Sequence, residues 1–89
     1  THAFDTGAAW VSLALQAHLS GLAAHGMGGF DKERLAMAMA LPEGHALHAV
    51  VAVGFAAPAD TLPEDLRKRE IPSGRKPVTA IAARGAFPA

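Results

Sequence analysis

One apolar segment, residues 5–29, runs without a proline for about the length of a long helix, and it limits how the whole chain can fold. Its pattern predicts a helix from about Thr6 to about Ala24, with Asp5 as the N-cap and Gly26 as the left-handed residue after the last turn. Because this helix is apolar on almost every side, it has to be covered on almost every side. We therefore expect it to be buried against other protein.

Two faces of the predicted helix are apolar by i, i+3, i+4 spacing. The first face consists of Trp10, Leu13, Ala14, Ala17 and Gly21. The second face consists of Ala8, Val11, Leu15, Leu19 and Leu22. Many of these side chains are small, so another backbone can approach the helix closely.

The alternative interpretation of this segment is a membrane span, since a span needs roughly 20 apolar residues. Alanine dominates the segment, however, and Gln16, His18 and His25 lie within or beside it without a flanking cluster of Lys or Arg. Alanine drives insertion weakly, and buried amide and imidazole groups oppose it. We therefore expect no membrane partner. The N-terminus also lacks the basic region of a signal peptide, so we expect a cytoplasmic protein.

The composition indicates that much apolar surface contacts something outside these residues. The chain has 89 residues, of which 51% are hydrophobic and 18% charged, although a chain this small needs proportionately more polar surface. A subunit partner, a further part of the protein or a cofactor would cover the excess. The formal net charge of zero argues against a nucleic-acid partner, which requires a positive field. The lack of cysteine excludes disulfides, thiolate metal ligands and a cysteine nucleophile.

Further along the chain, the pattern predicts a short second helix and a strand. Asp31 is the expected N-cap of a helix from Lys32 to about Ala40. This helix ends at Leu41-Pro42, because the residue before a proline is pushed out of the helical region. Residues 46–55 are predicted to form a strand that is apolar on both faces apart from His48, as is typical of a central strand.

The last third of the chain is punctuated by prolines, which prevent it from forming a compact core alone. They are Pro58, Pro63, Pro72 and Pro77. A short helix is predicted from about Pro63 to about Arg69, and a strand or irregular segment over residues 78–87. We expect residues 1–55 to form a helix-loop-helix-strand core and residues 56–89 to form an extended arm laid over other protein.

The sharpest candidate site is the glycine segment, which we define as Gly26, Met27, Gly28 and Gly29. Its bare backbone allows main-chain N–H groups to approach a flat or anionic ligand. The helix predicted after Asp31 adds a positive dipole nearby. The alternative is a tight helix–helix turn that uses glycine for its flexibility. His25, which precedes the segment, is the histidine that we retain as a site candidate.

The second candidate is the basic turn at residues 73–77. Arg75 and Lys76 lie beside Gly74, and prolines flank the turn. A guanidinium next to bare backbone suits a phosphate monoester. The alternative is a solvated basic turn.

The sequence predicts no metal site and no catalytic side chain. His45 and His48 have a possible metal spacing, but no carboxylate or cysteine lies at a matching offset. No serine–histidine–acid arrangement and no carboxylate pair stands out.

Four blocks of the sequence, taken in order, resemble the C-terminal half of the nitroreductase-family flavoproteins. They are DTGAAWVSLALQAHLSGLAAHGMGGFD, HAVVAVGF, LPEDLRKRE and SGRKP, and their spacing matches over nearly all of the chain. The resemblance implies an α+β fold, FMN as cofactor, NAD(P)H as reductant and an intertwined homodimer. It also implies that hydride passes from nicotinamide to flavin and then to a nitroaromatic, quinone or similar small acceptor.

By this resemblance, the long helix is the dimer-interface helix and the C-terminal arm wraps the other subunit. The glycine segment corresponds to backbone that faces the flavin ring near its reactive nitrogen. Many members carry glutamate where Gly28 stands, so that side-chain role is missing here. Arg75 corresponds to the arginine that binds the FMN phosphate. Ser73 stands where many members have a second cation, for which Lys76 would compensate.

The N-terminal half of the family has no counterpart in these residues. In the family, that half supplies a basic stretch for the ribityl and phosphate groups, the lid helices and several strands. We therefore expect residues 1–89 to be the C-terminal portion of an FMN-dependent oxidoreductase, completed by the missing half or by a homodimer partner. The alternative is a non-catalytic helical dimerisation fragment with no competent flavin site of its own.

Overall fold

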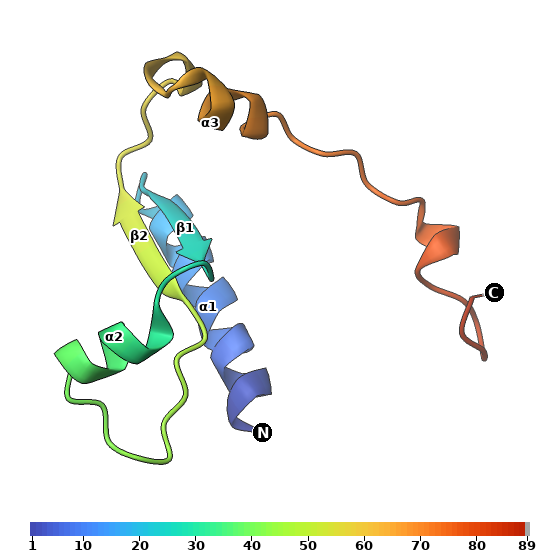
Figure 1. The fold of residues 1–89 in the computed structure, drawn as a ribbon. Coiled ribbons are helices and arrows are strands. Elements are labelled where there is room, and N and C mark those ends of the chain that lie inside the picture. The colour runs from blue at the N-terminus through green and yellow to red at the C-terminus, as the bar shows by residue number, and fades with distance from the viewer. Residues whose placement is uncertain (89) are drawn as a thin grey trace. The chain divides into compact units, whose positions relative to one another are not determined.

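Helix α1 (His2–Leu19) and a two-stranded sheet dominate the first of two units in the computed structural model, which describes residues 1–88 (Figure 1). This first unit, Thr1–Ala56, continues with strand β1 (Ala23–Met27), helix α2 (Lys32–Ala38) and strand β2 (Val50–Gly54). The long helix, the short helix and the sheet confirm the expected α+β class.

The N-terminal end of α1 lies earlier than the sequence predicts. Thr1 occupies the N-cap position, and the N–H of Asp5 already donates to the Thr1 carbonyl at 2.9 Å within the first turn. The predicted N-cap role of Asp5 is therefore wrong. Nothing between these residues breaks a helix, so α1 already begins at His2. The Asp5 carboxylate instead accepts from the Thr1 hydroxyl at 3.2 Å, near the positive end of the helix.

The C-terminal end of α1 also differs from the prediction, because the helix stops at Leu19 rather than near Ala24. Gly21 takes the left-handed conformation, with a φ of 76°. The Gly21 N–H donates to the His18 carbonyl at 3.0 Å, and the Leu22 N–H donates to the Ala17 carbonyl at 2.8 Å. This pair of bonds is the Schellman motif.

The predicted role of Gly26 as the residue after the last helical turn is wrong, because Gly26 lies in strand β1. The apolar run after the helix is too short for its period to separate helix from strand. β1 pairs antiparallel with β2, from Ala23 opposite Gly54 to Met27 opposite Val50. β2 lies inside the predicted strand over residues 46–55 but is shorter, and β1 is its one strand partner within residues 1–88.

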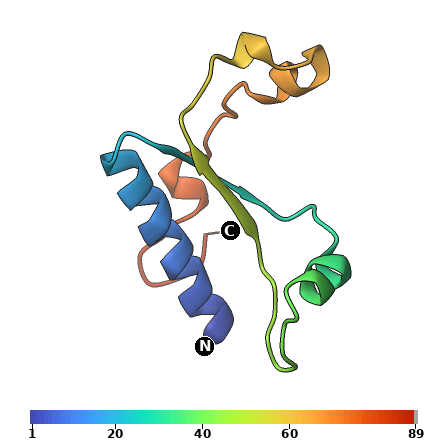
Figure 2. The same ribbon diagram turned by 90° about the vertical axis from the view of Figure 1, so that its left-hand side faces the viewer.

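The first predicted face of α1 packs against this sheet. Figures 1 and 2 both show α1 lying along one face of the antiparallel pair formed by β1 and β2. Ala17 on this face is 7% exposed, and Trp10 and Ala14 are half-buried. These three residues share one stripe of the helix because they follow i, i+4, i+7 spacing. The sheet therefore covers the stripe of α1 that runs from Trp10 through Ala14 to Ala17.

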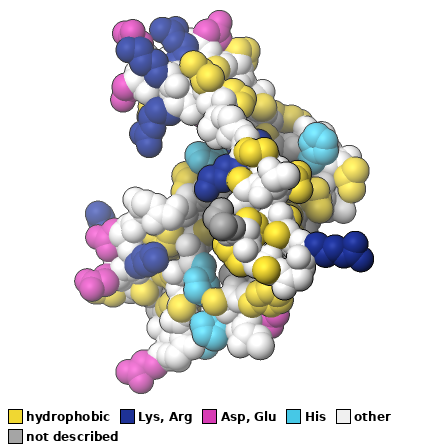
Figure 3. Space-filling model, turned by 90° about the vertical axis from the view of Figure 1, so that its right-hand side faces the viewer, with side chains coloured by type: hydrophobic (Ala, Val, Ile, Leu, Met, Phe, Trp, Pro, Cys, Tyr) yellow, Lys and Arg dark blue, Asp and Glu magenta, His cyan; other side chains and the backbone are white. Residues whose placement is uncertain are grey.

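The second predicted face of α1 has little cover from the rest of the first unit. Val11, Leu15 and Leu19 are 51%, 59% and 80% exposed. Figure 3 shows hydrophobic side chains at the surface among the charged ones. Exposed apolar surface on this scale marks an interaction site. None of the helices within residues 1–88 combines the length and hydropathy needed to cross a membrane.

Helix α2 begins as predicted. The Asp31 carboxylate accepts from the Arg34 N–H at 3.0 Å, which satisfies one of the free donors of the first turn. The helix ends two residues before the predicted limit, and Ala40 takes a φ of 49° to close it. The Leu41 N–H then donates to the Ala36 carbonyl at 2.9 Å. An alanine thus occupies a position that favours glycine.

The second unit begins at Ala57 and contains short helical elements joined by irregular chain. These are the 3-10 turn η1 (Ala59–Thr61), helix α3 (Glu64–Arg69) and the 3-10 turn η2 (Val78–Ala80). The helix predicted from Pro63 to Arg69 is confirmed by α3. Residues 81–88 have no strand, so of the two forms predicted for residues 78–87 the irregular one is observed.

Candidate functional site

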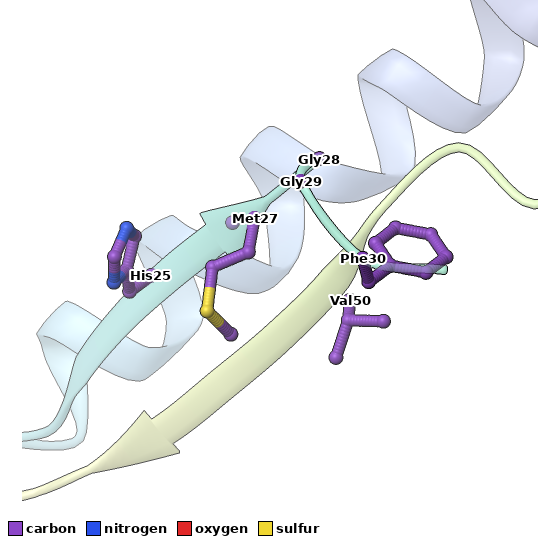
Figure 4. A pocket seen from close by; sticks show the side chains of 7 residues that line it. His25, Met27, Gly28, Gly29, Phe30 and Val50 are labelled. Atoms are coloured by element: carbon purple, nitrogen blue, oxygen red, sulfur yellow. The ribbon is translucent and has the colours of Figure 1, made fainter. Parts of the chain in front are cut away.

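The glycine segment lies where strand β1 ends and the chain turns toward α2. It lines a pocket of about 480 Å³ together with the residues around it. The lining residues are His25, Gly26, Met27, Gly28, Gly29, Phe30 and Val50 (Figure 4). The structure therefore brings the four predicted residues of the glycine segment into one pocket.

The alternation of side chains along β1 decides which residues face the pocket. Gly26 faces α1, since the nearest atoms to a Cβ built on it belong to the Trp10 indole. Successive side chains of a strand point to opposite faces, so His25 and Met27 lie on the other face of the sheet. Met27 is directly opposite Val50 in the register of the sheet. Figure 4 shows these two side chains near each other across the two strands, with Phe30 next to Val50.

The backbone beyond β1 is bare and has unused hydrogen-bond donors. A Cβ built on Gly28 or Gly29 meets no atom within 4 Å. Among residues 1–88, no oxygen accepts from the N–H of either glycine. Backbone N–H groups are strong donors that usually find a partner. These two are therefore free to donate to a ligand that enters the pocket.

The pocket lining carries little charge. His25 is its one titratable side chain, and the remaining lining is apolar or glycine. An apolar pocket with a few convergent polar groups is typical of a small-molecule or cofactor site. The pocket therefore suits a flat, largely apolar ligand. Acceptor atoms on the edge of such a ligand can receive hydrogen bonds from the main-chain N–H groups of Gly28 and Gly29.

Arg75 and Lys76 belong to the second unit and lie in the exposed irregular chain between α3 and η2. Nη1 of Arg75 donates to the carbonyl oxygen of Ser73 at 3.1 Å and to its hydroxyl oxygen at 3.0 Å. Within the part of the chain that is described, Lys76 forms no ion pair. Two cations of the basic turn are therefore presented to solvent.

The histidines do not gather into a metal centre in the described residues. Nδ1 of His45 lies 3.3 Å from the Glu43 carbonyl oxygen. The rings of His2 and His48 have centroids 6.1 Å apart, a pairing that the sequence analysis missed because it joins distant positions. Within residues 1–88, no group of three or more His, Cys, Asp or Glu residues could hold a metal ion.

Val50 and Trp10 are neighbours of the glycine segment that the sequence does not single out as such. Val50 could have been found only by recognising β1, since the antiparallel register is what places it opposite Met27. The large Trp10 on a face of small residues, together with a glycine downstream, was the available signal for a close helix–strand contact.

Comparison with protein-family models finds no match. Among curated proteins, the chain is similar to an uncharacterised 15.4 kDa protein in the ask 5′ region of Mycolicibacterium smegmatis. The two are 43% identical over 68 residues, which is 76% of this chain and 46% of that protein.

Among solved structures, the chain is similar to an oxidoreductase containing FMN. The sequence identity is 49% and the TM-score is 0.88, over 94% of this chain and 42% of the solved chain. The chain thus spans less than half the length of both proteins. Its fold is that of a part of an FMN-containing oxidoreductase.

Proposed function

We propose that this chain is part of an FMN-dependent oxidoreductase and that the glycine segment binds the flavin ring. The observation that carries the proposal is the pair of unpartnered N–H groups of Gly28 and Gly29 in a pocket of apolar lining. The 49% identity to an oxidoreductase containing FMN supports the choice of this ligand over other flat heteroaromatic molecules.

The residues present fit an isoalloxazine ring, which is flat and carries nitrogen and carbonyl acceptors on its edge. A Cβ built on Gly28 or Gly29 meets no atom within 4 Å, so the space beside these two residues is open to such a ring. When bound, FMN accepts hydride and passes it on. The Gly28 and Gly29 N–H groups would donate to the edge of the ring, which favours electron-rich forms of the flavin. Met27 and Val50 would contact the ring and keep water from it.

The basic turn would hold the phosphate end of the cofactor. The Arg75 guanidinium can donate two parallel hydrogen bonds to a phosphate, and Lys76 adds a second positive charge. Neither cation forms an ion pair with a carboxylate of residues 1–88, so both charges are available to an anion.

The remaining features of the proposed enzyme rest on the resemblance to nitroreductase-family flavoproteins. NAD(P)H would be the reductant, and a nitroaromatic, quinone or similar small molecule the acceptor. A homodimer partner or an N-terminal half of the protein would cover the exposed face of α1 and complete the flavin site. The protein would act in the cytoplasm.

A second candidate function is a non-catalytic helical dimerisation fragment. It is favoured by the exposed row of Val11, Leu15 and Leu19 on α1. It gives no reason for the free donors at Gly28 and Gly29. A dimer that is indifferent to FMN would support this candidate.

The experiment that tests the proposal is a titration of the protein, as its gene encodes it, with FMN. Trp10 is the one tryptophan of the chain, and it lies against Gly26 on the far side of the strand from the pocket. We expect FMN to bind with saturable quenching of the protein's tryptophan fluorescence, to which Trp10 contributes, and to give the visible absorbance of bound flavin. A colourless protein whose tryptophan fluorescence does not respond to FMN contradicts the proposal.

A further inference from the structure

The side chain of Arg75 is held by a residue two positions earlier in the chain. Both hydrogen bonds from its Nη1 group go to Ser73, one to the carbonyl oxygen and one to the hydroxyl. Residues two apart in extended chain point to the same side, so Ser73 and Arg75 are well placed to meet. The prolines at positions 72 and 77 fix φ at both ends of this turn.

The geometry of the guanidinium decides which N–H groups of Arg75 remain free to donate once Nη1 is bonded to Ser73. Nη1 is the amino group on the same side as Cδ, so Nε–H and Nη2 form the opposite edge of the planar fork. Within residues 1–88, no acceptor is bonded to Nε or Nη2 of Arg75. This free edge is the one that can donate two parallel hydrogen bonds to a phosphate.

The surroundings of the free edge are open. Residues 72–77 are exposed and lie outside helices and strands. A Cβ built on Gly74 meets no atom within 4 Å, so the chain between Ser73 and Arg75 does not crowd an approaching anion.

We propose that Ser73 is a positioning residue that orients Arg75 for the phosphate of FMN. This inference rests on the proposed function. An arginine side chain has many rotamers and loses this conformational entropy when it is fixed. A side chain that is already held by Ser73 loses less on binding, and the phosphate is bound more tightly for that reason.

The test compares FMN with riboflavin, which has the same ring and ribityl chain but no phosphate. In the protein as its gene encodes it, Ser73→Ala should weaken FMN binding by about three- to tenfold, the equivalent of one neutral hydrogen bond. Riboflavin binding should stay unchanged. Ser73→Thr, which keeps the hydroxyl, should bind FMN like the parent protein.

Ser20→Ala is the matched control, because the Ser20 hydroxyl is also exposed and also accepts from a side-chain nitrogen, Nε2 of Gln16 at 3.2 Å. It should change neither affinity. The proposal also requires that Ser73→Ala has no further effect once Arg75 is replaced by alanine, because Ser73 acts through that side chain.

The outcomes separate this inference from the proposed function. Failure of the parent protein to bind either flavin overturns the proposed function, and the role of Ser73 falls with it. Normal binding of both flavins, with an unchanged FMN-to-riboflavin ratio in Ser73→Ala, overturns the role of Ser73 alone. An equal loss of both affinities in Ser73→Ala also overturns it, since a phosphate-specific role cannot weaken riboflavin binding.

Discussion

The indole of Trp10 lies directly against the backbone of Gly26. A Cβ built on Gly26 would come within 3.0 Å of Trp10 Cζ2 and 3.2 Å of Cε2. This contact joins α1 to the strand that leads into the glycine segment. The backbone at Gly26 is therefore in tight contact with the helix, whereas Gly28 and Gly29 face open space.

Replacing Gly26 with alanine should destabilise the fold, because the new methyl group would come within 3.0 Å of the indole and the ring would have to shift. We expect a loss of about 1–3 kcal/mol in the free energy of unfolding, as for other overpacked sites. Chemical denaturation measures it. Gly54→Ala is the matched control, since Gly54 lies in the partner strand and an added Cβ meets nothing within 4 Å.

The same contact predicts a rescue. Trp10→Leu should remove the overlap, so that Gly26→Ala costs much less in the Trp10→Leu background than in the parent protein. Equal costs in the two backgrounds would show that Trp10 is not the obstacle at position 26.

Replacing Arg75 with alanine should weaken FMN binding by about 1.5–3 kcal/mol, roughly ten- to hundredfold, because a charge-assisted bond to the phosphate is lost. Isothermal titration measures the affinity. Lys68→Ala is a suitable control, since Lys68 is another exposed cation whose Nζ lies 3.4 Å from a Glu64 carboxylate oxygen on α3. Unchanged FMN affinity in the Arg75 variant would remove this residue from the site.

Replacing Ala40 with glycine should stabilise the first unit. Ala40 has a φ of 49° at the end of α2, and a left-handed conformation costs an L-residue roughly 1–2 kcal/mol. We expect Ala40→Gly to raise the free energy of unfolding by about 1 kcal/mol. Ala38→Gly, inside the same helix, should lower it by about 1 kcal/mol. Thermal or chemical denaturation of the two variants should therefore shift in opposite directions.

A charge on the uncovered face of α1 should disrupt association, because that face must be buried against a partner or a further part of the protein. Leu15 is 59% exposed within the described residues and lies in the middle of the face. We expect Leu15→Asp to reduce the assembled mass in size-exclusion chromatography with light scattering. Gln16→Asp places the same charge at a position that is already polar and exposed, and it should leave the mass unchanged. A parent-like mass in Leu15→Asp argues against burial of this face between two copies of the protein.

Much of the fold follows from local signals in the sequence. Asp31 marks the start of α2, and its carboxylate makes the expected bond to the Arg34 N–H. Pro63 and the acidic first turn mark α3 in the same way. The stripe through Trp10 and Ala17 was predicted from helical spacing, and its packing against the sheet follows it. These signals act within a few residues, so the sequence alone is sufficient for them.

Two kinds of feature could not be predicted from the sequence. In some places the same residues suit either of two local structures, and in others the structure depends on contacts between residues far apart in the chain. Gly21 and Gly26 both suit the end of α1, and only pairing with β2 decides that Gly26 belongs to a strand. The pocket lining by Val50 follows from the same pairing. The hydrogen bonds between Arg75 and Ser73 depend on side-chain rotamers that no sequence pattern specifies.

The most direct test of the account follows the amide resonances of Gly28 and Gly29 in ¹⁵N–¹H NMR spectra while FMN is added to the protein as its gene encodes it. The account predicts that both amide resonances shift saturably with the same Kd as the flavin absorbance, because their N–H groups become donors to the ring. Binding of FMN that leaves both resonances where they are, or no binding at all, would contradict it.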